Sequence, residues 1–209
     1  MNYFITGTDT GVGKTYVTSL LIQAFRAAGH DTVGFKPICC GSRDDAEALA
    51  AAADGRLSVN EVNPVWFRAE AAPYAAALIE NRLPDLDLIR ETFRSIRTRH
   101  QSVLVEGAGG WLVPILKDYS IADLAREMDL PVIVVSSNRL GTLNHTLLTV
   151  KAVRSSGLTC SGVILNNMKS SEEVAVVTNK SLLEELLDVP ILAEVQPNQE
   201  KGSCILPDI

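Results

Sequence analysis

The chain has 209 residues, of which 46% are hydrophobic and 21% are charged, a globular composition that excludes a disordered or collagen-like protein. Its formal net charge of −6 argues against a nucleic-acid binder, which usually presents a basic surface. The length predicts one domain over residues 1–209, and four cysteines are too few for a disulfide scaffold, so a reducing cytoplasm is the expected setting.

Six short apolar runs are predicted to be β-strands. They are continuously apolar and rich in β-branched residues, which is typical of parallel strands covered on both faces. Strand-like alternation between polar and apolar residues, the mark of a half-exposed sheet, is absent from them. The runs lie at residues 3–5, 32–35, 103–105, 132–135, 162–165 and 191–193.

Stretches with helical spacing separate these runs. One of them stops at Gly29, and another opens with Ser120 at the N-cap and Asp123 three residues later. Strand–helix alternation predicts right-handed crossovers and an α/β fold with a doubly wound, mostly parallel sheet flanked by helices. Residues 54–84 are the least regular, and we expect loops around a short helix there. The predicted helices span residues 14–28, 44–53, 86–99, 120–128, 142–156 and 171–187.

The segment GTDTGVGKT, residues 7–15, follows the first predicted strand and opens the first helix. That context is the one a phosphate-binding loop (P-loop) requires, because backbone N–H groups and the helix N-terminus together cradle phosphate oxygens. Thr8 stands where the usual pattern has its first glycine, so the loop is longer by one residue. Lys14 would bridge the terminal phosphates and Thr15 would bind Mg²⁺, which indicates a P-loop NTPase type of fold.

Two further charged residues follow predicted strands. Glu106 ends the strand at residues 103–105 and precedes a glycine-rich segment, and Lys36 follows the strand at residues 32–35. Ligands of open α/β sheets bind at the carboxyl ends of the strands, so we expect both side chains to face the phosphate loop. A carboxylate there suits Mg²⁺, and an ammonium stabilises charge on a transferred phosphoryl group or an acyl intermediate.

Four segments together resemble the dethiobiotin synthetase family. They are the loop at residues 7–15, Lys36 with Pro37, EGAGG at residues 106–110 and LGTLNH at residues 140–145, and the match runs from residue 2 to about residue 168. The resemblance implies an ATP- and Mg²⁺-dependent cyclo-ligase, which makes dethiobiotin from 7,8-diaminononanoate and CO₂ in the penultimate step of biotin synthesis. A carbamate and then a carbamoyl-phosphate mixed anhydride would precede closure of the ureido ring.

The resemblance also assigns roles to individual residues. Lys14 and Lys36 match the catalytic lysines, and Thr15, Asp45 and Glu106 match the metal ligands, with Asp44 left open as an alternative to Asp45. The residues matched to substrate contacts are Thr10, Lys36, Cys40 and Asn144. The residues matched to nucleotide binding are Thr10, Gly11, Val12, Gly13, Lys14, Thr15, Tyr16, Asp45, Glu106, Gly107, Ala108, Gly109, Asn166 and Asn167.

The family helix that carries the counterpart of Asn144 comes from the partner subunit and holds the substrate's carboxylate. The resemblance therefore implies a homodimer with active sites at the interface. No nucleic-acid partner is expected. No signal peptide is visible, and no stretch approaches the roughly 20 apolar residues of a membrane span, so we expect no membrane partner.

The sequence departs from the family pattern at three places. Cys40 falls on the substrate-contacting serine, and a thiol is the weaker hydrogen-bond donor. Gly11 replaces an acidic residue that some members carry. Residues 195–200 lack the usual Ile-Pro pair beside the base, so the choice among ATP, CTP and GTP stays open.

Three alternatives remain. A regulatory ATPase of the partition type would carry a second lysine five residues before Lys14, where this chain has Asp9. A related ATP-dependent ligase, such as a cobyrinate-type amide synthase, usually has a glutamine amidotransferase domain for which 209 residues leave no room. A relative that only binds nucleotide would not need Lys14, Thr15, Lys36 and Glu106 together.

Overall fold

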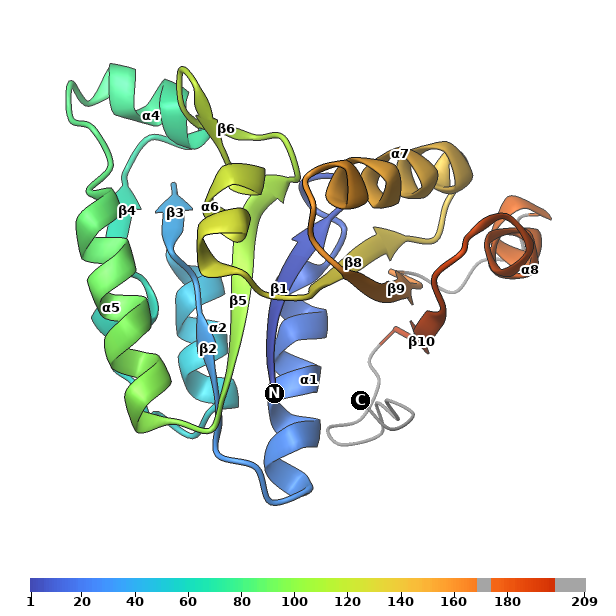
Figure 1. The fold of residues 1–209 in the computed structure, drawn as a ribbon, viewed down its shortest axis with the longest axis horizontal. Helices are drawn as coiled ribbons and strands as arrows, with labels where there is room; N and C mark the ends of the chain where they lie inside the picture. The colour runs from blue at the N-terminus through green and yellow to red at the C-terminus, as the bar shows by residue number, and fades with distance from the viewer. Residues whose placement is uncertain (169–173, 198–209) are drawn as a thin grey trace.

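A six-stranded sheet forms the centre of the computed structural model, which describes residues 1–168 and 174–197 (Figure 1). Its strand order is β10-β9-β8-β1-β5-β2, and every neighbouring pair is parallel. The predicted α/β fold with a parallel, doubly wound sheet is therefore confirmed. The strands are β1 (Asn2–Gly7), β2 (Thr32–Phe35), β5 (Ser102–Gly110), β8 (Val132–Ser137), β9 (Cys160–Asn166) and β10 (Ile191–Val195).

The six predicted helices are present, and their described ends agree with the predictions to within one residue. The first residues predicted for the last helix, 171–173, lie outside the described part of the chain. No helix in that described part is long and apolar enough to span a membrane. The helices are α1 (Lys14–Ala27), α2 (Asp44–Ala52), α5 (Leu86–Arg99), α6 (Ile121–Met128), α7 (Thr142–Ser155) and α8 (Val174–Leu186).

Helices cover both faces of the sheet. Neighbouring strand residues point to opposite faces, and in β2 a side chain on Gly34 would meet Ile22 of α1 and Leu49 of α2 at 2.9 Å. The next residue, Phe35, stacks on Phe93 of α5 with ring centroids 5.9 Å apart. The helices α1 and α2 therefore cover one face at this strand, and α5 covers the other.

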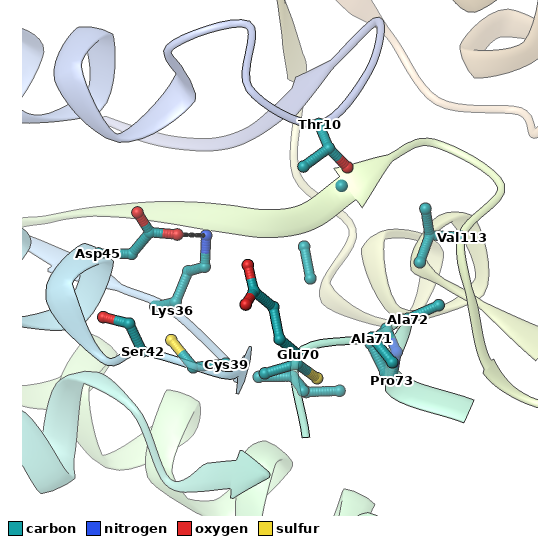
Figure 2. A pocket seen from close by; sticks show the side chains of 14 residues that line it. Thr10, Lys36, Cys39, Ser42, Asp45, Glu70, Ala71, Ala72, Pro73 and Val113 are labelled. Atoms are coloured by element: carbon teal, nitrogen blue, oxygen red, sulfur yellow. Dashed lines mark hydrogen bonds and ion pairs between the residues drawn. The ribbon is translucent and has the colours of Figure 1, made fainter. Parts of the chain in front are cut away.

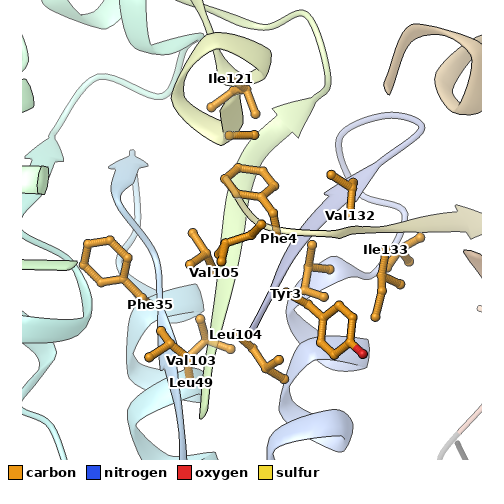
Figure 3. Close-up of a cluster of buried hydrophobic side chains, with 14 of the residues drawn as sticks. Tyr3, Phe4, Phe35, Leu49, Val103, Leu104, Val105, Ile121, Val132 and Ile133 are labelled. Atoms are coloured by element: carbon orange, nitrogen blue, oxygen red, sulfur yellow. The ribbon is translucent and has the colours of Figure 1, made fainter. Parts of the chain in front are cut away.

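The apolar strand residues form the core between these layers. Figure 3 shows Phe4 of β1 and Val105 of β5 at its centre, with Ile121 of α6 above them. All three side chains are buried. Burial of each such side chain stabilises the fold by about 1.5–3 kcal/mol relative to exposure. The core thereby stabilises the sheet in which β5 pairs with β1 and β2, so that the carboxyl ends of these three strands lie at the same edge.

The structure corrects the prediction for residues 54–84. Two short helices, α3 (Val59–Val62) and α4 (Pro73–Ile79), flank a strand, β4 (Val65–Phe67), which pairs in parallel with β3 (Ile38–Cys40). A second short pair, β6 (Pro114–Leu116) and β7 (Tyr119–Ser120), was also not predicted. Runs of two or three residues are too short to show strand periodicity, and only pairing with a distant segment makes them strands.

Candidate functional site

The phosphate loop joins the end of β1 to the start of α1, as predicted. Gly13 is the N-cap of α1 in a left-handed conformation, with φ of 85°, and no side chain caps the helix. The first N–H groups of an uncapped helix attract an anion, which makes this turn suited to phosphate. No residue with a side chain fits in place of Gly13, because its Cβ would lie 2.1 Å from Asn166 Nδ2.

The end of β9 supports this loop. Asn166 donates from Nδ2 to the carbonyl of Val12 at 2.9 Å, and Asn167 donates to Glu194 at 2.8 Å. The amide nitrogen of Asn166 therefore fixes the loop, while its predicted role in nucleotide binding stays a prediction. A cavity of about 260 Å³ opens beside these residues, lined by Gly13, Tyr16, Asn166, Asn167, Met168 and Pro197. Residues 198–200, the end of the segment that lacks the family's Ile-Pro pair, lie outside the described residues.

Lys36 lies at the centre of a cluster of charges in which Lys36 and Glu106 are buried and the Asp45 side chain is 47% exposed. Its Nζ donates to Asp45 Oδ2 at 2.8 Å and to Glu106 Oε1 at 2.5 Å. Lys36 is 3% exposed and Glu106 is fully buried. Burial alone would lower the pKa of the Lys36 ammonium, but the charges of Glu106 and Asp45 outweigh it and raise that pKa above its ordinary value. Lys36 is therefore held as a fixed cation.

The Thr15 hydroxyl completes the cluster. Its Oγ1 lies 2.7 Å from Asp45 Oδ1 and 2.8 Å from Glu106 Oε1. Burial would raise the pKa of Asp45, but the Lys36 charge and hydrogen bonds from Lys36 and Thr15 lower it, so the carboxylate stays ionised. Asp44 is exposed, and its recorded hydrogen bond joins its backbone N–H to Ser42. The geometry thus brings Asp45, and not Asp44, to Thr15.

These oxygens fit a divalent cation. A hydroxyl has one hydrogen and cannot donate to two carboxylates at once, and Glu106 Oε2 is buried without a hydrogen-bond partner. Hydroxyl and carboxylate oxygens are the ligands that Mg²⁺ prefers, usually together with water and substrate phosphates. Within residues 1–168 and 174–197, no three His, Cys, Asp or Glu side chains form a metal-binding group. The protein would therefore supply only part of the coordination shell.

The strand that carries Glu106 is longer than predicted. The sequence placed Glu106 at the end of its strand, but β5 continues through Gly107, Ala108 and Gly109 to Gly110. The register with β1 shifts between Ile5 and Gly7, where Gly7 pairs with Gly110. This irregularity lets the strand run on beside the phosphate loop, with Ala108 and Gly109 lining the adjacent pocket.

A pocket of about 400 Å³ opens beside the cluster (Figure 2). Cys40 is half-buried there, and burial raises the pKa of its thiol to about 11. Thr10 faces the pocket from the phosphate loop. The lining residues are Thr10, Lys36, Ile38, Cys39, Cys40, Ser42, Asp45, Glu70, Ala71, Ala72, Pro73, Ala108, Gly109 and Val113. Three of the four predicted substrate residues thus meet in one pocket.

Asn144, the fourth predicted substrate residue, does not line this pocket. It is exposed in the first turn of α7, whose N-cap, Gly141, also lacks a side-chain cap. Gly11, in the phosphate loop, is exposed and has a φ of 72°.

Sequence reasoning missed Asn63, which positions Lys36. Its buried amide donates to the carbonyls of Lys36 and Val65 at 2.9 Å each, and Lys36 N–H donates to Val62 at 2.7 Å. Arg43 in turn donates to Asn63. The only signal was an Asn-Pro pair, which is typical of a turn and does not reveal what it touches.

Nucleotide binding is expected to weaken as pH rises above about 8. Burial, followed by the nearby Lys36 charge, lowers the pKa of the Lys14 ammonium to about 8. Free protein therefore loses this proton above that pH, whereas bound phosphate favours the protonated form, so affinity falls by at most about tenfold per pH unit. Calorimetry of ADP binding from about pH 7 to about pH 9 checks this. A Lys14→Met variant should show a flat profile, and a flat wild-type profile would contradict the expectation.

The chain is similar to known proteins over most of its length. A family model described as an AAA domain matches residues 1–202. The ATP-dependent dethiobiotin synthetase BioD of Akkermansia muciniphila is 44% identical over 199 residues, covering 95% of this chain and 93% of that protein. The protein of the same name from Bacillus velezensis is 38% identical over 196 residues, covering 91% of this chain and 84% of its own length.

Solved structures share the fold at lower identity. The septum site-determining protein MinD of Pyrococcus horikoshii, complexed with Mg-ADP, matches with a TM-score of 0.56 and 17% identity, covering 95% of this chain and 82% of that chain. The MinC:MinD cell division complex of Aquifex aeolicus matches with a TM-score of 0.61 and 17% identity, covering 96% of this chain and 82% of that chain. Similarity at this level shows the P-loop fold alone.

Proposed function

This chain belongs to the ATP-dependent dethiobiotin synthetase family, and we propose that it forms the ureido ring of dethiobiotin from 7,8-diaminononanoate, CO₂ and ATP. It is a ligase of biotin biosynthesis. The observation that carries the proposed mechanism is the buried cation of Lys36, held by Asp45 and Glu106 beside the phosphate loop and at the wall of a pocket.

The reaction passes through anions. One amine of the diamine attacks CO₂ and loses a proton, which gives a carbamate. A carbamate oxygen attacks the γ-phosphorus of ATP and ADP leaves, and then the second amine attacks the carbonyl, loses its proton and expels phosphate. Lys36, a fixed and desolvated cation, stabilises the charge of the carbamate and of the mixed anhydride. No covalent bond to the protein is required, so positioning supplies much of the catalysis.

The phosphate loop orients ATP for this transfer. Lys14 lies at the start of α1 and is 7% exposed, so its ammonium meets phosphate in a poorly solvated site. Thr15, Asp45 and Glu106 would hold Mg²⁺, which neutralises phosphate charge when bound. The acid groups of the cluster thus have two tasks, since they also position Lys36.

Asp45→Asn is expected to lower kcat/KM about 100-fold, because Lys36 and Thr15 both lose a charged partner. The neighbouring Asp44→Asn variant removes the same charge from an exposed side chain and should stay within about twofold of wild type. Steady-state kinetics of the two purified variants decides between the two aspartates. A larger loss in Asp44→Asn would refute the assignment of Asp45.

A homodimer accounts for Asn144. The exposed apolar side chains Leu112, Leu140 and Leu148 are 69%, 81% and 59% exposed, and Leu112 and Leu148 line one cavity between the β5–β6 turn and α7. Covering such side chains with a second copy is favourable. In that dimer the first turn of α7 would reach the partner's pocket and bind the substrate carboxylate. Sedimentation at micromolar concentration tests the assembly.

The setting proposed for the enzyme is the cytoplasm. The described cysteines Cys39, Cys40 and Cys160 are free thiols. Burial raises the pKa of Cys39 to about 12, so this thiol is held in its unreactive form. Free thiols of this kind persist in a reducing compartment.

Mass spectrometry tests the activity directly. The protein is mixed with ATP, Mg²⁺, bicarbonate and 7,8-diaminononanoate, with Lys14→Ala as the inactive control. The expected product is heavier than the diamine by one carbonyl group less two hydrogen atoms. Absence of this product while ATP still binds would overturn the proposed substrate. Cys40→Ser, which restores the family's residue, would then be the first variant to test.

The phosphate loop does not support the alternative function of a regulatory ATPase of the partition type. Asp9 occupies the position where partition ATPases carry their second lysine, and its carbonyl accepts a hydrogen bond from Lys14 Nζ at 3.1 Å. The Asp9 carboxylate lies 3.6 Å from Arg139. An acidic residue at this position does not supply the positive charge that such a switch adds to the nucleotide phosphates.

A further inference from the structure

Glu70 brings a second carboxylate to the open pocket. It lies between β4 and α4, and Figure 2 shows its carboxylate pointing into the pocket that Lys36 and Thr10 also line. Asp45, the other acidic residue of the lining, is bound by Lys36 and Thr15. No hydrogen bond or ion pair engages the Glu70 carboxylate within residues 1–168 and 174–197. An unpaired anion thus faces the substrate space.

The backbone around Glu70 is held in place. Gly41 has a φ of 81°, and a Cβ there would lie 3.1 Å from Glu70 Cβ and 3.2 Å from Cγ. Gly41 N–H donates to the Phe67 carbonyl at 2.9 Å, and Trp66 Nε1 donates to the Gly41 carbonyl at 2.7 Å. The Cβ and Cγ atoms of Glu70 are therefore packed against Gly41, which has no side chain at the contact.

The substrate class explains what this anion would bind. Aliphatic amines have pKa values near that of lysine, about 10.4, but a first positive charge lowers the pKa of the neighbouring amine, so the diamine enters the pocket with one ammonium group and one less basic amine. Lys36 already neutralises the Asp45 carboxylate and repels a second cation nearby. Glu70 is the acidic residue of the pocket lining that is left for a substrate cation.

We propose that Glu70 binds the ammonium group of the diamine that waits while the other amine forms the carbamate, and that this group releases its proton to solvent before the amine attacks the mixed anhydride. This inference rests on the proposed function. Lys36 attracts the carbamate and Glu70 attracts the ammonium, so the two walls of the pocket orient the substrate by opposite charges. Glu70 thereby selects diamines over monoamines, and it acts on binding rather than on the phosphoryl transfer.

The Glu70→Gln variant tests this role. It keeps the side-chain shape and removes the charge, so the KM for the diamine is expected to rise about tenfold, with kcat and the KM for ATP within about twofold of wild type. Added salt should raise the wild-type KM for the diamine and leave that of Glu70→Gln nearly unchanged, because salt screens an exposed ion pair. Glu70→Asp, which retains the charge, should recover part of the affinity.

Glu91→Gln is the matched control, because Glu91 is exposed on α5 and does not line this pocket. An unchanged diamine KM in Glu70→Gln, with wild type active, would overturn the role of Glu70 alone. A fall in kcat together with a lower melting temperature would also overturn it, because it would indicate a structural role. A wild-type protein that forms no dethiobiotin would instead overturn the proposed function.

Discussion

The Lys36→Met variant is expected to form dethiobiotin about 1000-fold more slowly than wild type, or not at all. The substitution removes the desolvated cation that stabilises the carbamate and the mixed anhydride, and loss of one such electrostatic group typically costs about 100- to 1000-fold in kcat. ADP binding should persist, because the phosphate loop and Lys14 are unchanged. Product formation by mass spectrometry and ADP calorimetry on the same preparation measure the two effects.

Stability distinguishes this catalytic role from a structural one. Removing Lys36 leaves buried Glu106 without its cation, which costs about 3–5 kcal/mol of folding stability. A Lys36→Met/Glu106→Gln double variant removes both charges and should regain much of that stability in urea unfolding, yet stay inactive. Recovery of activity along with stability would show that Lys36 only holds the fold.

Glu106→Gln is expected to raise the Mg²⁺ concentration needed for half-maximal activity at least about tenfold, and to lower kcat about 100-fold. An amide replaces one of the two carboxylates of the cluster, and its nitrogen is a poor ligand for Mg²⁺. The Mg²⁺ dependence of ADP binding, measured by calorimetry, gives a readout that does not depend on turnover. Lys36 would also lose the negative charge of the group that accepts its 2.5 Å hydrogen bond.

Glu47→Gln provides the control for this charge loss. Glu47 lies on α2 with Asp45, but its side chain is exposed. The Mg²⁺ dependence of this variant should match that of wild type. If Glu106→Gln and Glu47→Gln respond alike to Mg²⁺, Glu106 is not a ligand and its role is confined to Lys36.

The amino-acid sequence was enough to predict the six strands of the parallel sheet, the phosphate loop and the six long helices. Continuous β-branched runs and helical spacing are local signals, and six strands and six helices carry them strongly enough to be placed. The loop at residues 7–15 also has a local signal in its glycines, Lys14 and Thr15, between a strand and a helix, although its contacts with Asn166, Asp45 and Glu106 appear only in the structure.

How the other site residues meet became visible only in the folded chain. It brought Asp45 rather than Asp44 to Thr15, because one step around α2 turns a side chain from the cluster to the exterior. It paired β3 with β4 and so placed Glu70 against Gly41. These contacts join segments tens of residues apart, where spacing along the chain carries no information about which side chains touch.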